Sequence, residues 1–422
     1  MVKEEHLSFG SVDVVELAER YGTPLYVTDE NKLRANIRAY KKTFGNTSIG
    51  TDIFFAVKAN GNLALLKVLA QEGAGADVFS AGELQLTKLA GIPREKILFN
   101  GNSKSEDDLR AAVESGVKIS VDSRDELRAL AAVTDERGKE AAIAIRVNPD
   151  VSPDVNPKIA TGLKESKFGV PYPEIISICE EVKQYRNIAL TGLHCHIGSQ
   201  ILKLDVFGEA AEKMMNLVMQ LHDRGIELEF VDLGGGLGIG YSDEDKKIAP
   251  TPDDLAAVLL PVLEDRMSSL NLKLILEPGR SIVGSTTILL SRVNTVKQAH
   301  KNFVAVDAGF NLLIRPVMYD AYHEVVVANR QNEPASTLYT VVGPVCESGD
   351  IIAKDRMLPE VKRGDLIAIH DAGAYGFSMS SQYNGRPRCA EVLVNDGEVD
   401  LIRARESVED LLRAQKVPER LT

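Results

Sequence analysis

Short apolar runs alternate with amphipathic stretches of helical periodicity from residue 50 to residue 280. An apolar run bounded by turn residues is typical of a buried strand, whereas a period near 3.6 residues is typical of a helix. The predicted strands are Ile53–Val57, Ala76–Phe79, Lys96–Phe99, Lys118–Val121, Ala142–Val147, Ala189–Cys195, Glu229–Leu233 and Lys273–Leu276. The predicted helices between them are Asn62–Glu72, Ala81–Ala90, Ser105–Glu114, Arg124–Arg137, Pro173–Tyr185, Asp205–Arg224 and Pro252–Ser269.

Eight β-α units within roughly 230 residues match the size of a (β/α)8 barrel. A doubly wound open sheet is the competing interpretation, because alternation alone does not distinguish an open sheet from a closed one. The count of eight favours the barrel. We therefore predict an α/β fold in which a (β/α)8 barrel spans residues 29–281.

The pattern changes after residue 282, where helical periodicity is scarce and turn signals join short strands. Ser407 and Asp410 form a capping pattern that predicts a short C-terminal helix. We predict a second, all-β domain that comprises residues 1–28 and 282–422 and ends in this helix. Its predicted strands are Pro24–Val27, Ser291–Val296, Phe303–Val306, Glu324–Val327, Leu338–Val342, Leu366–Ile369, Ala390–Val394 and Glu398–Ile402.

The composition is that of an acidic globular protein, with 422 residues, 26% charged residues and a formal net charge of −12. An acidic chain without a basic block is a poor candidate for binding nucleic acid or an anionic membrane. The four cysteines stand far apart with no CxxC motif, which argues against a zinc ribbon and fits a reducing compartment. No apolar run approaches the roughly 20 residues of a membrane span, and the N-terminus lacks a signal-peptide pattern. We expect a cytoplasmic protein.

Function in a barrel belongs at the C-terminal ends of its strands, and two charged residues lie there within apolar runs. Lys58 directly follows the first predicted strand, and Asp77 lies in the second. Desolvation penalises a buried ammonium, so Lys58 is either a strand-end lysine that reaches solvent or an amine of lowered pKa suited to a Schiff base. Asp77 is then either its counter-ion or part of a purely structural ion pair.

Two histidines, His194 and His196, close the sixth predicted strand and share one face of it. This spacing is found at metal sites of barrel hydrolases, but no other histidine ends a barrel strand and no acidic set obviously completes such a site. We therefore predict no metal. One of the two imidazoles would instead pack flat on a ligand, and the other would be a core residue.

The seventh and eighth predicted strands run into Gly234-Gly235-Gly236-Leu237-Gly238 and Glu277-Pro278-Gly279-Arg280. Adjacent glycines let a backbone approach a ligand closely and point N–H groups at an anion. In barrels the loops after strands seven and eight are the usual phosphate site. A plain turn and a surface ion pair are the alternatives.

These features together fit pyridoxal 5′-phosphate (PLP), a phosphorylated aromatic aldehyde. Lys58 would bind its aldehyde, and His196 would stack on its ring. The glycine loop would hold the phosphate. Glu277 would pair with the pyridine nitrogen and keep the ring a strong electron sink.

Six motifs resemble those of the PLP-dependent group IV decarboxylases, a family with an alanine-racemase-like barrel followed by a β domain. The resemblance covers nearly the whole chain. The motifs are AVKAN (56–60), HIGSQ (196–200), GGGLG (234–238), EPGR (277–280), CESGD (346–350) and DAGAY (371–375).

The resemblance implies that Lys58 forms the internal aldimine, that His196 stacks on the ring, and that Cys346 protonates the carbanion; these three would be the catalytic residues. In this family the last of them enters the site from the partner subunit, so the resemblance implies a homodimer with shared active sites. The implied cofactor contacts are Lys58, Asp77, His196, Ser199, Gly235, Gly236, Glu277, Gly279, Arg280 and Tyr375. The implied substrate contacts are Arg280, Arg315, Tyr319, Glu347 and Tyr375.

Within this family the motifs most resemble members that decarboxylate meso-2,6-diaminopimelate to L-lysine, the last step of lysine biosynthesis. Arg280 and Arg315 suit a distal carboxylate, since a guanidinium pairs with it bidentately, and Glu347 suits the distal ammonium. Three other functions stay open: a PLP-binding or amino-acid-binding regulator, a metal-dependent hydrolase, and a racemase on the same fold. The intact Lys58 and Cys346 argue against the regulator, which needs neither.

Overall fold

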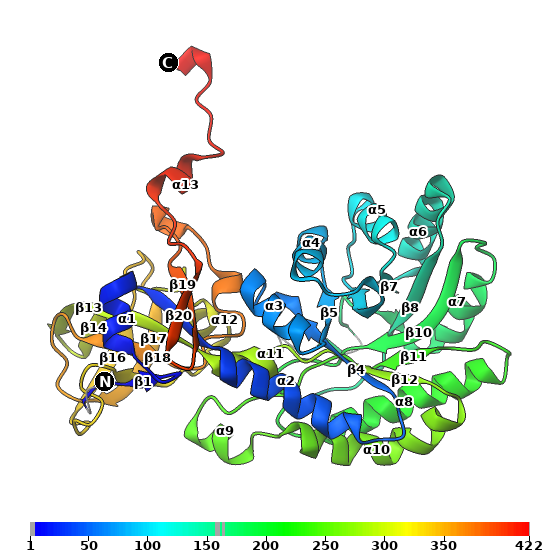
Figure 1. Ribbon diagram of the computed structural model, residues 1–422, viewed down its shortest axis with the longest axis horizontal. Helices are drawn as coiled ribbons and strands as arrows, with labels where there is room; N and C mark the ends of the chain where they lie inside the picture. Colours follow the sequence, from blue (N-terminus) through cyan, green and yellow to red (C-terminus); the bar gives the residue numbers. More distant parts are fainter. Residues whose placement is uncertain (1–4, 157–160, 163–164, 422) are drawn as a thin grey trace. The chain divides into compact units, whose positions relative to one another are not determined.

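A computed structural model describes residues 5–156, 161–162 and 165–421 of the chain (Figure 1). The chain folds into two compact units, one formed by Leu33–Ile282 and the other by the N-terminal residues up to Lys32 together with those from Val283 onward. Residues 159–170, a candidate for a loop that orders on substrate binding, fall partly outside the described residues.

The first unit is a closed barrel of eight parallel strands, each paired with its neighbours along the chain. The fifth and sixth strands pair from Ile188↔Ala141 to Cys195↔Val147. The eighth strand pairs with the first, which closes the ring. The open-sheet alternative is therefore wrong, and the (β/α)8 prediction is confirmed. The strands are β4 (Thr51–Ala56), β5 (Gly75–Val78), β6 (Ile97–Phe99), β7 (Lys118–Val121), β8 (Ala141–Asn148), β10 (Ile188–Cys195), β11 (Phe230–Asp232) and β12 (Lys273–Leu276).

Helices surround the barrel strands (Figure 1). Several begin at capping residues that satisfy the exposed N–H groups of the first turn, as Ser105 does with Asp108 in a reciprocal capping box. A two-residue strand, β9 (Val170–Pro171), pairs with the end of β8. The helices are α2 (Glu30–Gly45), α3 (Leu63–Gln71), α4 (Ala81–Ala90), α5 (Glu106–Ser115), α6 (Arg124–Arg137), α7 (Ile175–Val182), α8 (Asp205–His222), α9 (Asp243–Ile248), α10 (Pro252–Ser269) and α11 (Arg280–Val283).

Apolar side chains from different strands fill part of the barrel interior. Phe54, Leu98, Ala144, Phe230 and Ile275 form one buried cluster. Two glycines make room for the aromatic rings, since a Cβ at Gly75 would lie 2.3 Å from the Phe54 ring and one at Gly192 would lie 2.6 Å from the Phe230 ring. The buried polar side chains Asp77, His194 and Asp232 lie towards the C-terminal ends of β5, β10 and β11.

The second unit is built on a mixed sheet with the order β17-β16-β14-β13-β3-β19-β20, and β18 joins β13 to β15. Strand β3, from the N-terminal part of the chain, lies between β13 and β19, antiparallel to β13 and parallel to β19. Its strands are β3 (Leu25–Asp29), β13 (Thr287–Gln298), β14 (Asn302–Val306), β15 (Val325–Val327), β16 (Thr337–Val342), β17 (Ile351–Leu358), β18 (Leu366–Ile369), β19 (Ala390–Asn395) and β20 (Glu398–Arg403). The remaining elements are β1 (Ser8–Phe9), β2 (Val12–Asp13), α1 (Val14–Tyr21), α12 (Arg315–Tyr319) and α13 (Val408–Leu412).

The predicted strands agree with the observed ones to within a few residues, and the capping box at Ser407 begins α13 as expected. Several elements were not predicted, among them β17, α2 and the short elements α1, α9 and α12. Strand β17 contains three consecutive charged residues, Lys354-Asp355-Arg356, which interrupt its apolar alternation. Helix α2 is strongly polar apart from its buried face. Among the described residues, no helix is both long and apolar enough to cross a bilayer.

A carboxylate fastens the segment after β20 to the start of β19. Glu406 accepts hydrogen bonds from the Arg388 backbone N–H at 2.9 Å and from its Nε at 2.7 Å, and from Gln382 at 2.9 Å. Burial opposes ionisation, but these bonds outweigh it and lower the pKa of Glu406 to about 2. A carboxyl whose pKa is depressed on folding stabilises the protein above its ordinary pKa and loses that effect as the pH falls.

We predict that Glu406→Gln lowers stability at pH 7 by about 1 kcal/mol, because Arg388 is partly solvent-exposed and solvent screening weakens the pair. This corresponds to a fall in Tm of roughly 2–4 °C. The difference between variant and wild type should shrink as the pH falls from 5 towards 2. Thermal unfolding followed by circular dichroism measures it, with the exposed Glu398→Gln on β20 as the control. A difference independent of pH would contradict the assignment.

Candidate active site

The sequence-predicted residues of the barrel gather at the C-terminal ends of its strands. Lys58 lies in the single 3-10 turn Val57–Ala59 that directly follows β4, and Asp77 lies within β5. His196 follows β10, and the glycine run follows β11. Glu277 follows β12. Because parallel strands of a barrel end at one rim, the fold brings together groups that are up to about 220 positions apart in the chain.

Lys58 and Asp77 form an ion pair through Nζ and Oδ2. Asp77 is fully buried, while part of the Lys58 side chain is exposed. The Lys58 ammonium also lies 4.1 Å from the centre of the Phe79 ring. Burial raises the pKa of Asp77 and the charge of Glu277 raises it further, whereas Lys58 acts in the opposite direction. The amine at the rim is therefore held by a buried acid rather than left in solvent.

Asn100, which the sequence analysis missed, connects two acids of the site. Its side-chain Nδ2 donates to Asp77 Oδ1 at 2.6 Å and to Glu277 Oε1 at 2.7 Å. Asn100 directly follows β6 and is fully buried. The sequence signal for Asn100 was its position directly after a predicted strand. The rule that functional residues lie at the C-terminal ends of barrel strands, which selected Lys58, would also have selected Asn100.

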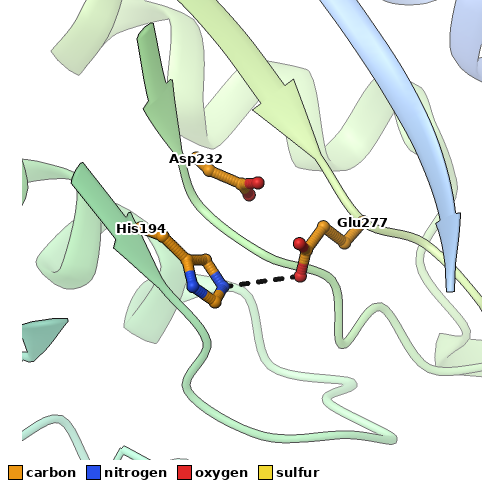
Figure 2. Close-up of side chains that lie close together, drawn as sticks. All are labelled: His194, Asp232 and Glu277. Carbon is orange, nitrogen blue, oxygen red and sulfur yellow. Dashed lines mark ion pairs between the residues drawn. The ribbon is translucent and has the colours of Figure 1, made fainter. Parts of the chain in front are cut away.

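Glu277 is buried and lies beside a second unpredicted acid, Asp232, at the end of β11 (Figure 2). His194 Nε2 lies 3.5 Å from Glu277 Oε2. One oxygen of each acid and one ring nitrogen of His194 all lie within 4.8 Å of one another. The sequence analysis found no acidic set beside the two histidines. That statement was wrong, because Asp232 and Glu277 come next to His194 only when the barrel closes.

His194 and His196 have different surroundings. The His194 ring is buried in the core, as expected for one of the pair, and its Nδ1 lies 2.7 Å from Ser120 Oγ. The His196 ring is only partly buried, and its Nδ1 accepts a hydrogen bond from the Gly235 backbone N–H at 3.2 Å. Burial holds the pKa of His196 well below its usual range, and the nearby charge of Lys58 acts in the same direction. His196 is therefore a neutral, flat ring at the rim.

The glycine run, which we call the glycine cradle, packs so closely against neighbouring backbone that a side chain there would clash. Gly234 and Gly236 have left-handed φ values of 69° and 119°. A Cβ at Gly235 would lie 2.0 Å from the Glu277 carbonyl oxygen, and one at Gly236 would lie 2.4 Å from that of Gly198. The backbone here requires glycine at these positions.

Arg280 begins α11 and is buried. Its Nη2 donates to Ser199 Oγ at 3.0 Å, and its Nη1 donates to the Tyr241 hydroxyl at 2.8 Å. Gly279 fits closely against β4 and the turn after it, since a Cβ there would lie 3.0 Å from Ala56 Cβ. A guanidinium, a hydroxyl and a close-packed glycine therefore come together in this part of the barrel.

The remaining predicted residues, Arg315, Tyr319, Cys346, Glu347 and Tyr375, belong to the second unit. Arg315 and Tyr319 begin and end α12. Arg315 is buried, and its Nη1 lies 2.8 Å from Nε2 of His323. Tyr375 has a left-handed φ of 57°, which is uncommon for a bulky residue and is typical of functional positions.

Cys346 is exposed and is held by two residues that sequence analysis missed. Its backbone N–H donates to Asn384 Oδ1 at 3.0 Å, and Asn384 Nδ2 donates to its Sγ at 3.5 Å. The Tyr383 hydroxyl lies 3.7 Å from Sγ and donates to Glu347. That hydrogen bond lowers the pKa of Glu347. The thiol and the carboxylate therefore form one connected group.

Comparisons with known proteins identify the family. Residues 30–284 match the pyridoxal-dependent decarboxylase family in its pyridoxal binding domain. The chain is 54% identical over 415 residues to diaminopimelate decarboxylase of Archaeoglobus fulgidus, covering 98% of this chain and 97% of the relative. It is 45% identical over 423 residues to that of Methanothermobacter thermautotrophicus, covering 99% and 97%.

Solved structures agree with the sequence relatives. The fold matches diaminopimelate decarboxylase of M. jannaschii in complex with L-lysine with a TM-score of 0.94 at 39% identity, covering 100% of this chain and 98% of that one. The barrel rim fits the pyridoxal phosphate of this family, because it holds an amine, a flat neutral imidazole, a buried acid and a backbone cradle that only glycine allows. The chain therefore belongs to the diaminopimelate decarboxylase family and is a pyridoxal-phosphate-dependent amino-acid decarboxylase.

Proposed function

We propose that the enzyme removes the carboxylate from one amino-acid centre of meso-2,6-diaminopimelate and releases L-lysine and CO2. Near full-length relatives named diaminopimelate decarboxylase support this substrate, as does the L-lysine bound by one related structure. The observation that carries the proposed chemistry is the ion pair of Lys58 with the buried Asp77 at the same rim as the glycine cradle.

The phosphate of the cofactor is held, in this proposal, by the backbone N–H of Gly236 together with Ser199 and Arg280, while Gly235 lines the same site and its N–H donates to His196. The N–H group and the guanidinium can donate to an anion, and the missing Cβ atoms let the glycine backbone pack against the carbonyl groups of Glu277 and Gly198. Gly279 allows the chain after β12 to pack closely against β4. These residues bind and orient the cofactor.

The ring is placed between His196 and the acids in this proposal. His196 offers a flat neutral face, because the Gly235 N–H occupies its Nδ1. Glu277 supplies the negative charge that favours a protonated pyridine nitrogen. When bound, the cofactor supplies the electron sink that takes up the electron pair left by the departing CO2.

Lys58 is the proposed attachment point of the cofactor. An amine attacks only in its neutral form, so its proton must be taken up nearby. Asp77 Oδ2 contacts Nζ directly, and burial raises the pKa of this acid, which makes it a better proton acceptor than an exposed carboxylate. Asp77 thus holds Lys58 in place and exchanges a proton with it.

Cys346 is the proposed donor of the proton that replaces CO2. The Asn384 amide contacts both the backbone N–H and the Sγ of Cys346, which orients Sγ. In a homodimer with shared active sites, Cys346 and Glu347 would serve the site of the partner subunit. We expect this dimer to work in the cytoplasm.

The far end of the substrate carries a second carboxylate and a second ammonium. We assign the carboxylate to Arg280 and Arg315, because a guanidinium binds it through two parallel hydrogen bonds. Glu347 suits the ammonium, since its lowered pKa keeps it charged. Tyr319 and Tyr375 complete the contacts, with Tyr375 reaching both cofactor and substrate.

The substrate assignment predicts that meso-diaminopimelate alone is decarboxylated among three amino acids of the wider family. Purified enzyme with PLP is offered meso-diaminopimelate, ornithine and arginine, and the amine products and CO2 are quantified. We expect equal amounts of L-lysine and CO2 from the first and no product from the others, which lack the distal carboxylate. Turnover of ornithine or arginine would contradict the distal-pocket assignment while leaving the cofactor assignment intact.

Arg315→Ala should raise the KM for meso-diaminopimelate roughly 100-fold, because it removes one partner of a buried charge pair. The absorbance of bound cofactor should not change. Arg315→Lys is the matched control: it keeps the positive charge but loses the two-pronged guanidinium, so its KM should lie between those of wild type and Arg315→Ala. Steady-state kinetics and an absorbance spectrum measure both effects. An unchanged KM, or loss of the cofactor absorbance, would count against the role of Arg315.

Lys58→Ala and Cys346→Ala should each be inactive alone and regain activity when mixed. Each mixed dimer would contain one active site with both native residues, so random exchange of subunits restores about a quarter of wild-type activity. Activity is assayed after exchange, with mixed dimers identified by differently tagged subunits. If mixed dimers form and remain inactive, the shared-site proposal is wrong.

A further inference from the structure

Asp232 is the one fully buried acid next to Glu277 to which the proposed function gives no role. It ends β11 and is the register partner of His194 on β10. Figure 2 shows both side chains pointing toward Glu277 from neighbouring strands. Its Oδ1 accepts the Gly234 backbone N–H at 2.8 Å, so it also holds the first residue of the glycine cradle.

The hydrogen bonds show which acid is poorly suited to carry a negative charge. Asp77 has the Lys58 ammonium and Asn100 as partners, and Glu277 accepts from Asn100. Asp232 has one neutral backbone donor, and no described residue donates to its Oδ2; its side-chain partner is the Glu277 carboxyl, a contact that raises the pKa of Asp232 and lowers that of Glu277. A buried carboxylate oxygen without a donor is costly, and a second negative charge beside Glu277 adds repulsion.

We propose that Asp232 keeps its proton in the folded enzyme and acts as a positioning residue for Glu277. Its Oδ2 hydroxyl would donate to the Glu277 carboxylate, so that the negative charge of the pair stays on Glu277 and Glu277 stays directed at the pyridine nitrogen. The role of Asp232 thus rests on the proposed function of Glu277, whereas its protonation does not.

The groups around Asp232 on each neighbouring element agree with this assignment. Burial, followed by the charge of Glu277 and then Asp77, raises the pKa of Asp232 well above its usual range. On β10, burial holds the pKa of His194 well below its usual range and raises that of Cys195, so both are neutral near pH 7. No cation among these neighbours compensates a charge on Asp232.

The cations of the site act on the other two acids. Burial raises the pKa of Glu277, and the charge of Lys58, the Asn100 hydrogen bond and the charge of Arg146 each oppose that rise. Lys58 also pairs directly with Asp77. Arg146 also pairs with Asp122 at 3.8 Å. Lys58 is therefore the cation that Asp77 and Glu277 share most directly, and Asp232 is the acid of the three that we infer to retain a proton.

A metal ion is the competing explanation for three possible ligands within 4.8 Å. It would need Asp232 ionised, and it would occupy His194 Nε2, because Nδ1 lies against Ser120 Oγ. The two explanations make opposite predictions for an uncharged residue at position 232.

Asp232→Asn is the decisive variant, because its oxygen can still accept the Gly234 N–H and its amide can still donate to Glu277. We expect its kcat to lie within about 3-fold of wild type at pH 7, with the cofactor absorbance unchanged. Asp232→Ala removes the donor and should lower kcat about 10- to 100-fold with little effect on KM, since Asp232 does not touch substrate. A lower kcat with an unchanged KM in Asp232→Ala, together with a near-normal kcat in Asp232→Asn, distinguishes a positioning role from simple loss of structure.

Protonation is tested separately on the full chain without cofactor. Infrared difference spectra between wild type and Asp232→Asn at pH 7 should show the carbonyl band of a protonated carboxylic acid in the wild type only. The Tm advantage of the Asn variant should increase with pH, because the folded wild type must keep a proton that the unfolded chain releases.

Two results would overturn the proposal. One is a missing acid band together with a loss of kcat of more than 10-fold in Asp232→Asn. The other is a stoichiometric divalent cation in the purified holoenzyme that this variant no longer binds. If the acid band is present but Glu277→Gln retains full activity, the assigned role of Glu277 fails, and with it the positioning role, while the proton on Asp232 stands.

Discussion

The burial of charge at the barrel rim is the constraint on which the rest of the site depends. Asp77 and Glu277 are removed from water, so each needs a partner that lowers the cost of its charge. Lys58 supplies one, and Asn100 joins the two acids through a single amide. An amine held by a buried acid is oriented and can exchange its proton locally, which is what a cofactor-bearing lysine requires.

The barrel provides this environment by separating its interior into apolar and polar parts. Phe54 and Phe230 belong to the buried apolar cluster, where Gly75 and Gly192 make room for them. Polar side chains occur where β5, β10 and β11 approach their ends. Beyond these ends, Gly235 and Gly236 bring backbone close to backbone, and the N–H of Gly235 donates to the His196 ring. The same strands thus position the acids and the cradle.

Sequence alone predicted the eight barrel strands, because buried parallel strands read as regular apolar runs. Lys58 and Asp77 were found because a charge within such a run is unusual. Asn100 and Asp232 were missed, since a single polar residue at a strand end is common and its partner becomes visible only when the barrel closes. Tyr383 and Asn384 contact Cys346 across a separation of 37 and 38 residues, which no local pattern records.

The central claim is that Lys58 carries the cofactor. Treating the holoenzyme with borohydride makes a lysine-bound pyridoxal phosphate permanent, and peptide mass spectrometry then locates it. We predict a single modified lysine, Lys58, and no modification in Lys58→Ala. A cofactor fixed to another lysine, or a holoenzyme in which none is modified, would contradict the account.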